Sequence, residues 1–171
     1  MKEILSKKLK ARINNIKIFA CDVDGTLTDG CVYYSKYGEE LKKFSLRDGR
    51  GAFLLKEKDI EVGIITTENS EIVKRRAEKL GLDFCFLGIT DKLSCIQDYL
   101  RLKHLELENV AFIGDDTNDL DVLIKCGVSF AVSDANESLL NVVDVICMNK
   151  GGEGAFREAV NLVIGVKDEK N

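Results

Sequence analysis

The sequence predicts an α/β protein built on a parallel, doubly wound sheet. Short, strongly apolar runs such as residues 16–21 alternate with longer segments of helical periodicity. The apolar runs are hydrophobic on both faces, as buried parallel strands are. Regular alternation of strands and helices in one chain favours a parallel sheet with helices on both sides. At 171 residues, 45% of them hydrophobic, the chain has the length of one domain, so we expect a single domain over residues 1–171.

The first elements are a helix, a strand and a hairpin. Leu5, Leu9 and Ile13 share one helical face, which predicts a helix before the first strand. The run 16–21 predicts that strand, in the centre of the sheet. Residues 31–34 and 41–46 flank the turn-forming residues 35–38 and predict a β-hairpin, the only irregular insertion in the pattern.

After the hairpin the chain alternates regularly between helices and strands. The predicted strands are 61–66, 84–87, 110–113, 128–132 and 143–147. The predicted helices begin at Asp48 and then cover 70–80, 92–102, 119–126 and 155–164, with Gly81 and Gly127 as stop signals. This order is typical of a Rossmann-like fold.

Polar side chains follow the ends of four predicted strands. Asp22 and Asp24 follow the first strand, and Thr66 ends the next one. Lys92 and Asp115 follow the strands at 84–87 and 110–113. The carboxyl ends of parallel strands meet at one edge of a sheet, where ligands bind. We therefore expect these five side chains to converge.

This set of groups predicts phosphoryl-transfer chemistry. Three carboxylates form a hard oxygen site suited to Mg²⁺, which also binds substrate phosphate. The hydroxyl of Thr66 and the ammonium of Lys92 are suited to the remaining phosphoryl oxygens. Phosphoryl transfer depends mainly on such positioning and charge neutralisation, and a carboxylate can act as the nucleophile.

The ordered motifs resemble those of the haloacid dehalogenase-like phosphatases across nearly the whole chain. They are DVDGT at 22–26, the terminal Thr66, Lys92, and GDDTND at 114–119. The resemblance implies that Asp22 is the nucleophile, and that Asp24 protonates the leaving alkoxide and then activates water. It also implies that Thr66 and Lys92 bind the phosphoryl group. The implied Mg²⁺ ligands are Asp22, the main-chain carbonyl of Asp24, and Asp115, with Asp116, Asn118 and Asp119 close to them.

Finer matches resemble the small sugar-acid phosphatases. They lie at residues 22–30, at Arg47 to Gly49, and at 151–158. This branch includes 3-deoxy-D-manno-octulosonate 8-phosphate phosphatases and their nonulosonate 9-phosphate relatives. The resemblance implies a phosphorylated sugar acid as substrate, with Arg47 as a contact. It also implies no large cap domain and a homotetramer in which the hairpin and C-terminal segment of a neighbour cover each active site.

The second motif bears on the substrate. Octulosonate enzymes typically have Thr-Gly-Arg there, whereas this chain has Thr66-Thr67-Glu68. Glu68, with Lys79 on the following helix, resembles the nonulosonate branch. The favoured substrate is therefore a nonulosonate 9-phosphate of the KDN or sialic-acid type, and octulosonate 8-phosphate is the alternative. Thr67 stands at the position of the glycine in the Thr-Gly-Arg motif, so a side chain lies where the glycine backbone usually approaches the ligand.

Two alternatives from other classes stay open. A receiver-like phosphoacceptor domain also uses acidic residues, a threonine and a lysine, but it has no use for a second acid such as Asp24. A non-catalytic assembly domain is the other, because similar domains fused to cytidylyltransferases can be inert.

Composition excludes several further classes. A net charge of −4 without a dense Lys/Arg block argues against nucleic-acid or membrane-surface binding. The N-terminus lacks a signal-peptide pattern and the six cysteines form no CxxC pair, so we expect reduced thiols and a cytoplasmic location. His104 is the only histidine, which makes a zinc site improbable. The run 74–76, Lys-Arg-Arg, predicts a solvated helix face.

Overall fold

The computed structural model describes residues 5–169 and contains a six-stranded parallel sheet with the strand order β5-β4-β1-β6-β7-β8. The predicted fold class is confirmed. The strands are β1 (Ile18–Cys21), β4 (Glu61–Ile65), β5 (Phe84–Phe86), β6 (Val110–Gly114), β7 (Val128–Ala131) and β8 (Val145–Ile146). β1 lies in the middle because its residues are apolar and buried on both faces.

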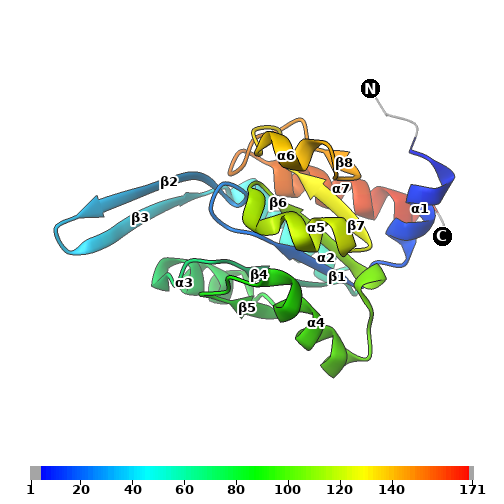
Figure 1. Ribbon diagram of the computed structural model, residues 1–171, viewed down its shortest axis with the longest axis horizontal. Helices are drawn as coiled ribbons and strands as arrows, with labels where there is room; N and C mark the ends of the chain where they lie inside the picture. The colour runs from blue at the N-terminus through cyan, green and yellow to red at the C-terminus, as the bar shows by residue number, and fades with distance from the viewer. Residues whose placement is uncertain (1–4, 170–171) are drawn as a thin grey trace.

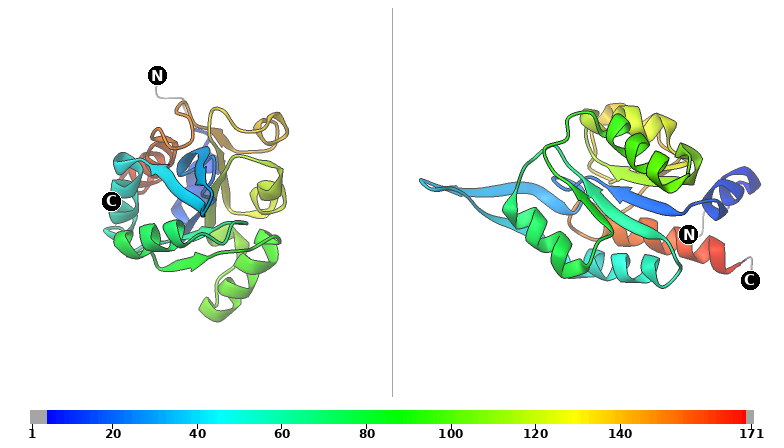
Figure 2. Two further views of the ribbon diagram at one scale, coloured as in Figure 1. Left: turned by 90° about the vertical axis from the view of Figure 1, so that its left-hand side faces the viewer. Right: turned by 90° about the horizontal axis from the view of Figure 1, so that it is seen from below.

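Helices cover both faces of this sheet, as the end-on view in Figure 2 shows. They are α1 (Lys7–Asn14), α2 (Leu46–Lys56), α3 (Glu71–Leu80), α4 (Lys92–Lys103), α5 (Leu120–Lys125), α6 (Glu137–Leu140) and α7 (Ala155–Asp168). Two short 3₁₀ helices are η1 (Leu107–Asn109) and η2 (Thr117–Asp119). None of the described helices has both the length and the apolar character needed to cross a membrane.

Alternate side chains of β1 belong to two hydrophobic cores. Phe19 and Cys21 point into the core beneath α1, α2, α3 and α7. Ile18 and Ala20 point into the core beneath α4, α5 and α6. This division is the physical meaning of a doubly wound sheet, because a strand buried on both sides needs apolar residues at every position.

The strand register brings three strand ends to the same level. Cys21 lies opposite Ile64 of β4 and Ile113 of β6. The loops that follow these strands therefore start at one edge of the sheet, where the polar motif residues are expected.

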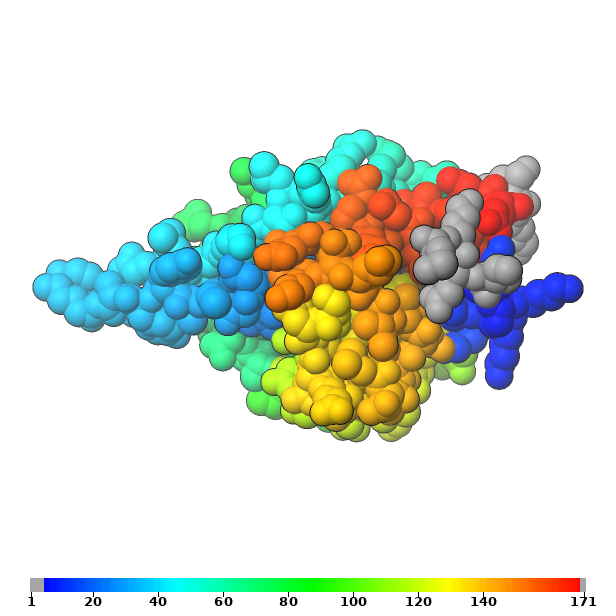
Figure 3. Space-filling view, turned by 90° about the horizontal axis from the view of Figure 1, so that it is seen from above, coloured from blue at the N-terminus to red at the C-terminus, as the bar shows by residue number. Residues whose placement is uncertain are grey.

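A separate hairpin leaves the molecule at this edge. Its strands are β2 (Thr28–Ser35) and β3 (Gly38–Phe44), which pair antiparallel. Figure 1 shows it projecting away from the end of the molecule that carries both termini, and the space-filling view of Figure 3 shows it as a slender arm. No large cap domain is inserted among the described residues.

Several elements differ from the sequence-based prediction, among them β2 and β3, which each begin three residues earlier than predicted. The helix α6 was not predicted, because four residues are too few for a helical period to show. β8 is only two residues long, since Asp144 next to it turns its carboxylate to Arg12 and to the amide of Ser129. α7 continues four residues beyond its predicted end at Ile164.

Candidate active site

The loop after β1 carries the first two aspartates. The amide of Asp22 donates to the carbonyl of Ile113 on β6, which places its buried side chain at the sheet edge. The amides of residues 26, 27 and 28 all donate to the carbonyl of Val23, at 3.2, 2.8 and 3.0 Å. Gly25 has φ +87°, a left-handed conformation that favours glycine. The chain therefore turns sharply after Asp24 and continues into the hairpin.

Three carboxylates gather at this edge. Oxygens of Asp22, Asp115 and Asp119 all lie within 4.8 Å of one another. Burial raises the pKa of Asp22 well above its ordinary value, and the nearby Asp119 raises it further. Burial and Asp119 likewise raise the pKa of Asp115 to about 6. So much negative charge in a buried space favours a bound cation, and carboxylate oxygens are the ligands that Mg²⁺ prefers.

Lys92 joins two of these acids. It is the first residue of α4 and is buried, and its Nζ donates to Asp22 Oδ1 at 2.5 Å and to Asp119 Oδ1 at 2.6 Å. Burial alone would lower the pKa of Lys92, but the two carboxylates outweigh that effect and the pKa is raised. A cation at a helix N-terminus is unfavourable without such partners. Asp119 also accepts a hydrogen bond from the amide of Asp115 at 3.1 Å. It therefore holds both Lys92 and the loop that carries Asp115 in place.

The loop after β4 brings Thr66 to the same edge. Thr66 is buried, and its hydroxyl oxygen accepts the amide of Glu68 at 3.3 Å. The exposed Thr67 accepts a hydrogen bond from Asn118 Nδ2 at 3.1 Å. Asn118 therefore connects the Thr66–Glu68 loop to η2, while the exposed Asp116 caps η2 by accepting the amide of Thr117 at 2.8 Å.

Asp24 is not one of the three clustered carboxylates, and it contacts Lys42. The Nζ of Lys42 donates to Asp24 Oδ1 at 2.5 Å. The sequence prediction did not include Lys42, which lies on β3. The alternation of side chains along β3 was the sequence signal that could have pointed to it, because adjacent residues such as Lys42 and Lys43 lie on opposite faces of a hairpin. Lys43 is exposed and pairs with Asp29 at 3.1 Å.

The glycine pair after β8 packs directly on the catalytic loop. The amide of Gly152 donates to the carbonyl of Thr26 at 3.0 Å. A Cβ at Gly151 would lie 1.7 Å from the carbonyl oxygen of Gly25. Only a residue without a side chain permits this approach. The segment thus supports the loop that carries Asp22 and Asp24.

Comparison with known proteins agrees with this geometry. A family model of haloacid dehalogenase-like hydrolases matches residues 88–157. The 3-deoxy-D-manno-octulosonate 8-phosphate phosphatase of Haemophilus influenzae is 39% identical over 156 residues, which cover 91% of this chain and 87% of the relative. The chain belongs to the haloacid dehalogenase-like hydrolases. It is a phosphatase of the cap-less type, which sets aside the receiver-like and non-catalytic alternatives.

Solved structures of this family superpose closely. The octulosonate 8-phosphate phosphatase of Yersinia pestis has a TM-score of 0.92 and 38% identity, covering 96% of this chain and 89% of that one. The enzyme of Moraxella catarrhalis, solved with magnesium, phosphate and KDO, also has a TM-score of 0.92, with 35% identity and coverage of 96% and 95%.

The structure of this haloacid dehalogenase-like phosphatase separates the predicted selectivity residues. Glu68 is exposed and lies beside Thr66. Arg47 is exposed in the first turn of α2, at a shallow surface hollow with Asn149 and Arg157. Lys79 is in the last turn of α3, about 12 Å along the helix from its first residue. The structure therefore does not bring Lys79 to the site within one chain.

Asp48, in the motif that includes Arg47, has a structural position. It is buried, and its carboxylate accepts the amides of Gly154 at 3.2 Å and Arg157 at 2.8 Å. Burial raises the pKa of Asp48, although these hydrogen bonds oppose the shift. Asp48 therefore links α2 to the start of α7.

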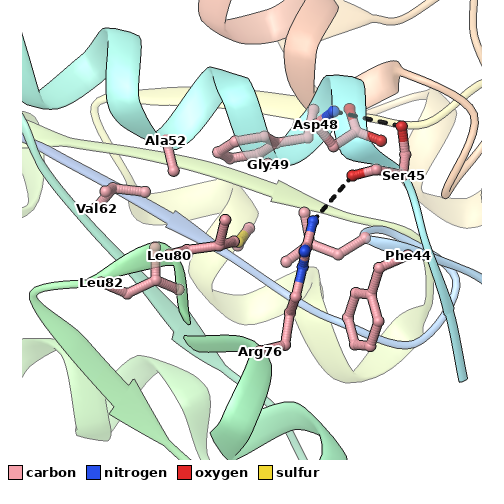
Figure 4. A pocket seen from close by; sticks show the side chains of 12 residues that line it. Phe44, Ser45, Asp48, Gly49, Ala52, Val62, Arg76, Leu80 and Leu82 are labelled. Carbon is pink, nitrogen blue, oxygen red and sulfur yellow. Dashed lines mark hydrogen bonds between the residues drawn. The ribbon is translucent and has the colours of Figure 1, made fainter. Parts of the chain in front are cut away.

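Arg76 lines a small apolar pocket next to the active site, so the prediction of a fully solvated face for 74–76 is wrong at this residue. Its guanidinium donates to the carbonyl of Ser45 at 3.1 Å and lies over the ring of Phe44, as Figure 4 shows. Arg76 adjoins the buried stripe of Val73, Ala77 and Leu80 on α3. This places it at the base of the hairpin, which it helps to hold.

Proposed function

We propose that this phosphatase hydrolyses the terminal phosphate ester of 3-deoxy-D-manno-octulosonate 8-phosphate with the help of Mg²⁺. The observation that carries the proposal is the likeness to enzymes of that name, at 38–40% identity over more than nine tenths of this chain. The sequence motifs favoured a nonulosonate 9-phosphate, but the comparisons support the eight-carbon substrate better. The nine-carbon ester is the second candidate, because Glu68 is exposed and its amide contacts the hydroxyl of Thr66.

The site suggests a two-step reaction. In the first step a carboxylate oxygen of Asp22 attacks phosphorus and the bond from phosphorus to the sugar oxygen breaks. Asp24 gives a proton to that oxygen, so the sugar leaves as an alcohol and Asp22 carries the phosphoryl group. In the second step water attacks phosphorus and passes a proton to Asp24, while the bond to Asp22 breaks. Inorganic phosphate leaves and both aspartates return to their initial state.

The other side chains of the site bind the phosphoryl group and the metal ion and neutralise charge. Lys92, already 2.5 Å from Asp22, lies where it can balance phosphoryl charge, and the hydroxyl of Thr66 offers a further hydrogen bond. Asp22, Asp115 and the main-chain carbonyl of Asp24 would hold Mg²⁺, with Asp119 beside them. The ion supplies charge neutralisation at the transferring phosphoryl group.

We infer that the hairpin arm contacts other copies of the chain in a homotetramer. Its outer half carries exposed aromatic and aliphatic side chains that nothing among residues 5–169 covers: Tyr33, Tyr34, Tyr37 and Leu41. Large exposed apolar surfaces of this kind mark interaction sites. A neighbour's arm over the site would exclude water from the phosphoryl group. A cytoplasmic location stays a prediction, supported by six free cysteines.

Phosphate release measured with Mg²⁺ tests the proposal. We expect a higher kcat/KM for octulosonate 8-phosphate than for nonulosonate 9-phosphates, and no turnover by Asp22→Asn. A preference for the nine-carbon esters would replace the proposed substrate and leave the reaction in place. Turnover by Asp22→Asn at the wild-type rate would contradict the nucleophile.

A further inference from the structure

Lys42 is a buried lysine from the hairpin that contacts a catalytic carboxylate. Only 3% of its side chain is exposed, and its Nζ lies 2.5 Å from Asp24 Oδ1. Placing an ammonium group out of water is costly unless opposite charges compensate it. Exposed ion pairs contribute little, but here the lysine side chain is almost fully buried at the base of the hairpin, while 30% of the Asp24 side chain is exposed. Its burial indicates a contact that the fold is built to keep.

The two oxygens of Asp24 have different surroundings. Oδ1 accepts the hydrogen bond from Lys42, whereas Oδ2 is buried and has no hydrogen-bond partner within residues 5–169. A buried carboxylate oxygen without a partner is unfavourable and uncommon in folded proteins. Such an atom marks a place where a group outside the chain completes the contact. A substrate oxygen or a water molecule suits that place, because each can share a proton with Oδ2.

A second acid holds Lys42 from the other side. Glu39 Oε2 lies 3.8 Å from the Nζ of Lys42, and Glu39 Oε1 accepts the hydroxyl of Ser70 at 2.5 Å. Ser70 is the N-cap of α3 and follows the loop that carries Thr66. Lys42 is therefore held between the catalytic loop and the loop with the phosphate-binding threonine.

We propose that Lys42 is a positioning residue for Asp24. By holding Oδ1 it keeps the carboxylate from rotating and leaves Oδ2 facing the ester oxygen in the first step and water in the second. In this role Lys42 acts through Asp24, whose Oδ1 it contacts. This inference rests on the proposed acid and base role of Asp24. It gives Asp22 and Asp24 separate lysine partners, Lys92 and Lys42.

The effect of removing Lys42 on the rate depends on the leaving group of the phosphate ester. A sugar alkoxide is strongly basic and needs a proton as it departs, whereas p-nitrophenolate leaves with little help from an acid. A poorly placed general acid costs roughly 10²-fold in rate. Removing Lys42 should therefore slow the first step for a sugar phosphate much more than for p-nitrophenyl phosphate.

The experiment compares the first-step rates for octulosonate 8-phosphate and p-nitrophenyl phosphate in rapid-mixing assays. We expect Lys42→Met to lose roughly 10²-fold on the sugar phosphate, with little change in KM, and only a few-fold on the nitrophenyl ester. Lys42→Arg, which keeps the charge, should recover part of the loss. Lys43→Met is the matched control, because Lys43 is 55% exposed on the opposite face and should leave both rates unchanged.

Two results would overturn the inference. One is an equal loss on both esters, which points to a general structural defect; the other is no loss in Lys42→Met. Lys42→Gln is measured alongside, with thermal unfolding of each variant, so that one misfolded protein does not decide the result. Asp24→Asn distinguishes a failure of the inference about Lys42 from a failure of the proposed role of Asp24. If this variant too slows both esters equally, the proposed role of Asp24 is wrong.

Discussion

Gly25 shows how a single missing side chain shapes the site. Its φ of +87° turns the catalytic loop, and a Cβ there would lie 2.0 Å from Oδ2 of Asp115. No Cβ can approach a carboxylate oxygen so closely, so an added methyl group must displace the aspartate that the site offers to Mg²⁺. Thr26 holds the other oxygen of Asp115 at 3.3 Å, which leaves the carboxylate little freedom to move aside.

We expect Gly25→Ala to weaken Mg²⁺ binding and to lower kcat by about 10²-fold or more, because Asp115 is displaced. Gly30→Ala is the matched control: Gly30 has φ +72° in the same segment, and its Cβ would meet nothing closer than 3.6 Å. The control should lose only about 1–2 kcal/mol of stability from the left-handed backbone. Calorimetric titration with Mg²⁺ measures the difference, and equal affinities for the two variants would contradict it.

The pKa of Asp115 predicts a pH dependence of Mg²⁺ binding. Burial and Asp119 raise this pKa from 3.8 to about 6, so the metal-free native state holds a proton that the unfolded chain would release. The contribution of Asp115 to the free energy of unfolding is therefore favourable at low pH and is lost as the pH rises through about 6. Mg²⁺ competes with the same proton for the Asp115 carboxylate. The affinity for Mg²⁺ therefore increases with pH, whereas the contribution of Asp115 to the free energy of unfolding decreases.

We expect Mg²⁺ affinity to rise as the pH increases through about 6, because the proton on Asp115 must leave as the ion binds. The increase in Tm on adding Mg²⁺ should be larger near pH 7.5 than near pH 5. Thermal unfolding with and without Mg²⁺ across this range measures it, and a shift independent of pH would count against the assignment of Asp115 as a ligand.

At the scale of elements, the start of α7 depends on a side chain from α2. The N-cap position of α7 is Gly154, which has no side chain to cap the helix. Asp48 performs this task across 106 residues of chain by accepting the amides of Gly154 and Arg157. Hydrogen bonds to a charged acceptor at a helix N-terminus are among the stronger ones. The same contact holds the glycine segment that supports the catalytic loop.

We expect Asp48→Ala to lower the free energy of unfolding by about 2 kcal/mol, because one buried and one part-buried amide lose their acceptor. Ser6→Ala is the comparison, since Ser6 caps α1 by accepting only the exposed amide of Leu9 and should cost about 0.5–1 kcal/mol. Urea unfolding measures both changes. An equal or smaller loss in Asp48→Ala would show that the buried link adds nothing beyond an ordinary cap.

The sequence predicted an element well where the residues that begin and end it lie within the element or next to it. Ser70 and Gly81 mark the ends of α3 in the sequence, and the structure uses both, Ser70 as N-cap and Gly81 as left-handed C-cap. Periodicity could not reveal α6, and it could not reveal that Arg76 bends inward to Ser45. Those features depend on neighbours that are distant in the chain.

In the whole molecule, the outer half of the hairpin arm projects away from the body of the protein (Figure 1). Tyr33 and Leu41 lie opposite each other across its two strands and are 58% and 63% exposed. A two-stranded hairpin is only marginally stable by itself in water. In Figures 1 and 3 the arm extends far beyond the sheet and its helices, so its outer half lacks contacts that a partner copy would provide.

We expect Tyr33→Lys combined with Leu41→Lys to shift the protein from a tetramer to smaller species, because each large apolar side chain contributes about 1.5–3 kcal/mol when buried. Leu102→Lys is the control: Leu102 is 80% exposed at the end of α4, away from the arm. Light scattering over a range of concentrations gives the mass. A monomeric wild-type protein, or an unchanged mass in the double variant, would contradict the proposed assembly.

The order of elements along the chain was enough to predict the sheet and the placement of Asp22, Thr66, Lys92 and Asp115 at one of its edges. Parallel strands end at one edge, so order along the chain is enough to bring such residues together. The sequence did not predict which of two adjacent lysines pairs with Asp24, or that Asp48 caps a distant helix; both depend on how the chain folds. Lys42 and Lys43 are chemically identical. What distinguishes them is the direction in which the folded hairpin turns each side chain, and that follows from packing between distant segments.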